Sequence, residues 1–168
     1  MTRWMWTGHT AQVTSMLDEL FIRMGGNPAG VTMQQYITGM QGYVNARGRN
    51  IQLTSLRTGH NQLNEAQMKA NFRNGNLMTL FASGFSIVAF DGIRTHSNHD
   101  IINHGTSTGN HIMMAYGYRR IRYYNAANQL IRNDLYVYVH TGFSSPVRAL
   151  VPLYRFGYVY NALITRIF

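Results

Sequence analysis

The chain of 168 residues suits a single domain with a substantial hydrophobic core. It carries 15 basic and 6 acidic residues, a formal net charge of +9, and no cysteine, which excludes disulfides, thiolate metal sites and a cysteine nucleophile. No apolar run approaches the length of a membrane span and no N-terminal segment has the pattern of a signal peptide, so we expect neither feature.

Two amphipathic helices are expected near the start of the chain. Apolar residues recur at helical spacing over residues 13–24, and a following Gly-Gly pair supplies the end of this first helix. Thr32, with Gln35 three residues later, has the pattern of a capping box. The second helix is therefore expected to begin at Thr32 and to end near Gly48.

The next part of the chain is expected to contain a short strand and a third helix. Residues 51–54 have the composition of a strand. The helix is expected to begin after Asn64 and to run to about Ala82, with its middle interrupted by the Asn-Gly-Asn stretch at residues 74–76.

From Phe85 onward the apolar pattern changes to that of strands. The run from Phe85 to Phe90 predicts a buried strand, and residues 91–110 predict a polar loop rich in His, Asn, Gly and Thr. A hairpin turn is expected at residues 126–128. Further strands are expected at residues 111–118, 120–124, 135–140 and 158–165.

Helices followed by strands predict an α+β fold, with N-terminal helices packed on an antiparallel β-sheet formed by the C-terminal half. We expect one domain over residues 1–168, mainly helical in 1–84 and mainly strands in 85–168. The apolar spacing also predicts the core. The side chains expected to be buried are Val13, Leu17, Leu20, Phe21, Ile87, Val88, Met114, Val137 and Val139.

Four segments carry motifs in a defined order along the chain. They are Trp-Thr-Gly-His-Thr-Ala at 6–11, Gly-Phe-Ser-Ile-Val-Ala-Phe at 84–90, Gly-Asn-His-Ile-Met-Met-Ala-Tyr-Gly-Tyr at 109–118 and Tyr-Val-Tyr-Val-His-Thr-Gly-Phe at 136–143. Together these segments resemble the motifs of papain-like cysteine peptidases. The nearest branches are bacterial, the double-glycine leader peptidases and the streptopain-like enzymes. The resemblance implies a papain-like fold over nearly the whole chain.

The resemblance also implies roles for four residues. His9 stands where the family has its nucleophilic cysteine, at the start of the first helix, where the helix dipole favours a thiolate. His111 falls at the general-base position and His140 at the position of the orienting Asn or Asp. Arg3 aligns with the glutamine of the oxyanion hole. Because His9 replaces the cysteine, the acyl-enzyme route is lost, and the chain is expected to be silent as a peptidase.

Three interpretations follow. In the first, the domain has no cofactor and either binds a peptide or protein in the family's cleft without cleaving it or is an inactivated former peptidase. In the second, His9, His111 and His140 converge on a transition metal such as zinc, because three imidazoles with an open position can form a hydrolytic metal centre. In the third, the chain is a basic interaction or structural domain whose cleft has no role.

Other histidines and acids lie in the polar loop that precedes His111. They are His96, His99, His104, Asp91 and Asp100. A solvated loop is the expected state of these residues, since irregular spacing fixes no ligand geometry. Either Asp91 or Asp100 could orient His111 in place of His140, and the spacing does not decide between them.

The basic residues indicate anionic partners in general, but they are scattered along the sequence. The tightest cluster is Arg-Arg-Ile-Arg at 119–122, and alternation along a strand would divide its side chains between two faces. The sequence has no signature of an RNA-recognition motif, a zinc finger or a helix-turn-helix. We therefore expect no specific recognition of nucleic acid.

Overall fold

The structure is a computed structural model, and it describes residues 10–27, 30–60, 62–89, 93–96, 99–102, 105–106, 109–142, 148–154 and 158–168. It has an α+β fold with three described helices and one large antiparallel sheet. The chain divides into two compact units, residues 1–53 with 166–168 and residues 54–165. No helix in the described ranges is both long and apolar enough to cross a membrane.

The first unit contains a pair of helices, α1 (Thr10–Arg23) and α2 (Met33–Asn45). The capping box predicted at the start of α2 is present, because Thr32 accepts a hydrogen bond from the Gln35 backbone while the Gln35 side chain accepts one from the Thr32 backbone. The two helices meet closely at Gly39. A Cβ atom there would contact Met24, including its backbone nitrogen at 3.1 Å. Glycine therefore permits the approach of α1 to α2.

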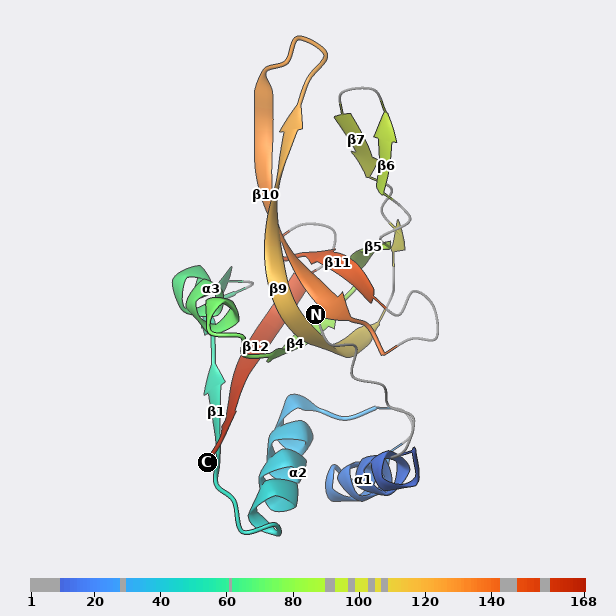
Figure 1. The fold of residues 1–168 in the computed structure, drawn as a ribbon, viewed down its shortest axis with the longest axis vertical. Coiled ribbons are helices and arrows are strands. Elements are labelled where there is room, and N and C mark those ends of the chain that lie inside the picture. The colour runs from blue at the N-terminus through green and yellow to red at the C-terminus, as the bar shows by residue number, and fades with distance from the viewer. Residues whose placement is uncertain are drawn as a thin grey trace. The chain divides into compact units, whose positions relative to one another are not determined.

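The sheet has eight strands in the order β1-β12-β4-β9-β10-β11-β5-β8, and every pair with a described register is antiparallel (Figure 1). Two small hairpins, β2–β3 and β6–β7, and one helix, α3 (Glu65–Arg73), complete the fold. The strands are β1 (Ile51–Ser55), β2 (Arg57–Gly59), β3 (Gln62–Leu63), β4 (Met78–Ser83), β5 (Ser86–Ala89), β6 (Ile93–His96), β7 (His99–Ile102), β8 (Gly105–Thr106), β9 (Asn110–Tyr124), β10 (Leu130–His140), β11 (Arg148–Pro152) and β12 (Tyr158–Ile167).

The two faces of β10 contribute to different apolar clusters. Leu135, Val137 and Val139 enter the main core, while Tyr136 packs with residues of the opposite face. This alternation follows from the two-residue period of a strand. Other members of the main core include Leu56, Met68, Met78, Leu80, Phe85, Met113, Ala115, Val151, Leu153, Ala162 and Ile164.

Three of the predicted elements are corrected by the structure. Residues 78–83, expected at the end of the third helix, form β4, which pairs with β9 and β12 on its two sides. The polar segment 91–110 contains β6, β7 and β8 rather than only loop. Residues 110–124 form one continuous strand, and β11 was not predicted at all.

The predicted core is correct at three positions of the sheet and wrong at three other positions, one of them also in the sheet. Val88, Val137 and Val139 are fully buried. Leu17, Phe21 and Met114 are exposed, with 55%, 45% and 51% of their surface accessible. Met24 of the predicted stripe lies against Gly39 of α2, and Met16 is half-buried, so the stripe is exposed at Leu17 and Phe21 and not along its whole length. In β9, Met114 lies on the face opposite to its buried neighbours. The expected burial of Val13 lies outside the described side chains, and Leu20 and Ile87 are half-buried.

Candidate functional site

His111 is the second residue of β9 and lies on the face of the strand that enters the main core. Met113 and Ala115, two and four residues further along, are buried on the same face. The imidazole ring stacks on the ring of Phe85, with centroids 6.0 Å apart and planes inclined by 14°. The start of β9 therefore fixes both the position and the plane of this ring.

The orienting partner of His111 is a backbone group. Its Nε2–H donates a hydrogen bond to the carbonyl oxygen of Thr141, which follows directly after β10. Thr141 is fully buried, and Gly142 next to it has a φ of +75°. A Cβ atom at Gly142 would lie 3.9 Å from Nε2, so the glycine backbone runs close beside the imidazole. With its proton on Nε2, a neutral His111 has Nδ1 as its basic nitrogen.

His140 ends β10, which pairs with β9 as the sequence predicted, but its side chain does not reach the ring of His111. The register places His140 opposite Met114. Directly opposed residues share a face, and Met114 lies on the other face of β9 from His111. His140 is exposed on that outer face, where it also pairs in register with Arg148 of β11. The Thr141 carbonyl, and not the His140 side chain, orients His111 in this structure.

The side chains of the remaining residues named from the sequence lie outside the described part of the structure. His9, Arg3, Asp91 and His104 lie outside the described residues. In the backbone register of β6 with β7, His96 pairs with His99 and Thr95 pairs with Asp100. Within the described ranges no group of three His, Asp or Glu side chains is close enough to hold a metal ion. The three-histidine zinc site stays a prediction, because His9 is one of its ligands.

A pocket of about 480 Å³ lies elsewhere in the second unit, between the start of α3 and strands β9, β10 and β11. Its charged groups are already paired, since Glu65 bonds to Arg120 at 3.0 Å and Arg132 bonds to Asp134 at 3.0 Å. Burial raises the pKa of the Tyr154 hydroxyl at its rim to about 12. The charges that line this pocket are thus compensated by ion pairs within the lining itself.

Sequence reasoning missed Thr141, because any residue type supplies a backbone carbonyl. The available signal was the glycine at 142 directly after a strand, which is typical of a sharp change in chain direction. No protein-family model matches the chain, and no curated protein or solved structure matches it either.

Proposed function

We propose that the chain is a papain-like domain that retains the base and its orienting acceptor, lacks the thiol, and binds a peptide or protein segment without cleaving it. The observation that supports the proposal most is the hydrogen bond from His111 Nε2–H to the Thr141 carbonyl. A histidine at the start of one strand, oriented by an acceptor at the end of its neighbour, is the base half of a nucleophile–base arrangement.

The other half of that arrangement is changed in this chain. There is no cysteine anywhere in the sequence, and His9 stands at the position that the resemblance gives to the nucleophile. A neutral imidazole attacks activated acyl groups but is a poor nucleophile toward a stable peptide bond. A segment bound at His111 would therefore stay intact, and binding is the activity that remains.

The proposal requires His9 to come within reach of His111, and an introduced thiol tests this. We expect the thiol of His9→Cys to be unusually acidic, because the positive end of α1 and the neighbouring imidazole both favour a thiolate. It should react with iodoacetamide at mildly acidic pH, where an ordinary cysteine of pKa about 8.5 is protonated. Adding His111→Ala should return its reactivity to that of an ordinary thiol.

Ser15→Cys is the matched control, because Ser15 is an exposed residue inside the same helix. Its thiol should react only at alkaline pH, and its reactivity should be the same with and without His111→Ala. If the two thiols show the same pH profile, His9 and His111 do not share a site and the papain-like proposal fails.

Binding is measured separately, with a tryptic digest of casein as a source of unstructured peptides. We expect peptides of the digest to shift the NMR signals of His111 and Thr141 while remaining uncleaved by mass spectrometry. Shifts confined to other surfaces would contradict a peptide site at His111. Cleavage that persists in His111→Ala would trace to a contaminating peptidase, and cleavage that His111→Ala abolishes would contradict the silent assignment.

A further inference from the structure

Strands β9 and β10 continue beyond the sheet as a two-stranded ribbon (Figure 1). The register of β9 with β4 ends at Ala115, and the register of β10 with β11 begins at Tyr136. Between these positions and the turn, residues 116–124 of β9 pair with β10 and residues 130–135 of β10 pair with β9, and neither range pairs with another described strand. At about 3.3 Å per residue, the β9 arm of this ribbon extends roughly 30 Å.

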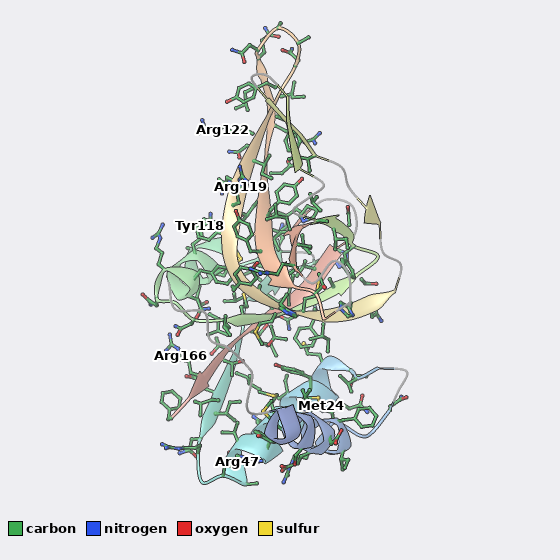
Figure 2. The ribbon with its side chains drawn as sticks, turned by 45° about the vertical axis from the view of Figure 1, so that its right-hand side comes forward. Met24, Arg47, Tyr118, Arg119, Arg122 and Arg166 are labelled. Carbon is green, nitrogen blue, oxygen red and sulfur yellow. The ribbon has the colours of Figure 1, made fainter. Side chains whose placement is uncertain are left out.

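The ribbon carries arginines on both of its faces. Arg119 lies opposite Tyr136 and shares its face, while Arg120 and Arg122 lie on the other face. Arg120 is bonded to Glu65 of α3. Arg119 and Arg122 are exposed, and within the described residues neither has a carboxylate partner; both are labelled along the ribbon in Figure 2.

Side-chain contacts support the ribbon on both of its faces. On one face, Tyr118 stacks with Phe72 of α3, with centroids 6.3 Å apart, and the Lys69 ammonium lies 6.0 Å from the Tyr118 ring. On the other face, the hydroxyls of Tyr123 and Tyr136 are hydrogen-bonded to each other. An arm held in one conformation before binding loses less entropy when it docks.

Few carboxylates are present to neutralise the basic residues. The described ion pairs use three acids, Glu19, Glu65 and Asp134, and the whole sequence contains six against 15 basic residues. The uncompensated positive charge attracts a polyanion at long range. Arg119 and Arg122 place two of these uncompensated charges on the ribbon.

We propose that the β9–β10 ribbon docks in a groove of double-helical nucleic acid, with Arg119 and Arg122 contacting phosphates of opposite groove walls. A two-stranded ribbon is of a size that the major groove of a duplex admits. The length of the β9 arm is close to one helical turn, about 34 Å. Phosphate contacts carry no sequence information, so this binding is independent of base sequence. The proposal does not depend on the site at His111.

The end of the ribbon favours a nucleic-acid groove over a lipid surface. The turn is polar, with Asn125 donating a side-chain hydrogen bond to Gln129 at 2.8 Å. The exposed apolar residues Tyr124, Leu130 and Ile131 lie behind this turn, where they would not be the first groups to enter a bilayer. A groove wall, in contrast, contacts the sides of the ribbon, where the arginines lie.

The test is fluorescence anisotropy with a labelled 20-base-pair DNA duplex of arbitrary sequence, titrated with the full chain over a range of salt concentrations. The variant Arg119→Gln/Arg122→Gln is expected to weaken binding about tenfold at low salt. It should also reduce the slope of log affinity against log salt by about two, one for each phosphate contact removed. The control Arg49→Gln/Arg73→Gln removes the same charge from exposed residues outside the ribbon and should leave the slope unchanged.

Three results would overturn the proposal. Equal losses for the two double variants would mean that net charge alone drives the binding. Equal affinity for single-stranded DNA of the same length would show that binding does not require the groove of a duplex. Absence of duplex binding at low salt, with binding to vesicles containing phosphatidylserine that Ile131→Gln abolishes, would assign the ribbon to an anionic membrane instead.

Discussion

His111 and Thr141 are joined through a ring nitrogen and a backbone oxygen, so no side chain at the end of β10 is needed to orient the imidazole. The exposed His140 lies one residue before this acceptor and on the other face of the strand. The direction of the Thr141 carbonyl depends on the backbone of Gly142, whose φ of +75° is in the left-handed region. The geometry of the site thus depends on a glycine that does not itself bind anything.

Gly142→Ala is expected to remove the hydrogen bond at His111, because a Cβ at positive φ costs about 1 kcal/mol and turns the backbone. The measurement is the ¹⁵N and ¹H NMR signals of the imidazole, in which the bonded Nε2–H disappears. Gly75→Ala is the matched control, since Gly75 has a φ of +74° and a Cβ added there would meet no atom within 4 Å. It should lose similar stability and keep the His111 signals. His140→Ala should keep them too, and their loss in that variant would contradict the assignment of Thr141.

Two glycines of α2 should respond in opposite directions to alanine. Gly39→Ala places a Cβ against Met24 and 3.2 Å from the backbone carbon of Arg23, which should destabilise the helix pair by about 1–3 kcal/mol. At Gly42 the nearest atom is the flexible end of Arg23, and Gly42→Ala should stabilise the helix by up to about 1 kcal/mol. Urea unfolding of the two variants gives both values. Loss of stability in both variants would mean that α1 packs on α2 along a longer stretch.

Low pH should weaken the contact between α1 and α2, because protonation of Glu19 removes its ion pairs with Arg23 and Arg47. Hydrogen bonds from Arg47 and Arg23 lower the pKa of this carboxyl from 4.5 to about 2. A depressed folded-state pKa stabilises the fold above the unfolded value, so the contribution is complete above about pH 4.5 and is lost as the pH falls through about 2. We expect the difference in Tm between the wild type and Glu19→Gln to shrink over that window, and to shrink with added salt because the pair is exposed. Asp18→Asn, which removes a neighbouring charge with no described ion pair, should show no such trend.

The local elements were predictable where a few neighbouring residues decide the structure. The capping box at Thr32 needs only Gln35, three residues away, and it forms as the sequence indicates. The apolar run of β4 is compatible with both a helix and a strand, so the sequence of this segment does not distinguish the two. Its state is decided by β9 and β12 on either side, which are distant in sequence. Pairing with strands that are distant in sequence cannot be predicted from the residues of the segment itself.

The position of His111 at the start of a strand was predictable, and the acceptor of its hydrogen bond was not. The motif around residues 109–118 places a histidine at a strand start, and β9 begins at Asn110. The resemblance gives the orienting position to His140, whereas in the structure the ring of His111 bonds to a backbone carbonyl one residue later. Alternation along β10 reverses the face with each residue, so an error of one position moves the predicted group to the other side of the sheet.

The last prediction concerns the exposed face of α1, where the apolar residues have helical spacing but are not buried. Leu17 belongs to the predicted apolar stripe and is 55% exposed, while Leu80 in β4 is fully buried in the main core. Leu80→Ala removes a buried side chain between strands and should cost about 2–5 kcal/mol. Leu17→Ala should change the free energy of unfolding by less than about 0.5 kcal/mol, as for an exposed position. Chemical unfolding of each variant measures both. A loss at Leu17 as large as the loss at Leu80 would show that this face of α1 is covered in solution, by a second copy of the chain or by part of the same chain. Repeating the Leu17→Ala measurement at several protein concentrations distinguishes these causes, since only association with a second copy makes the loss depend on concentration.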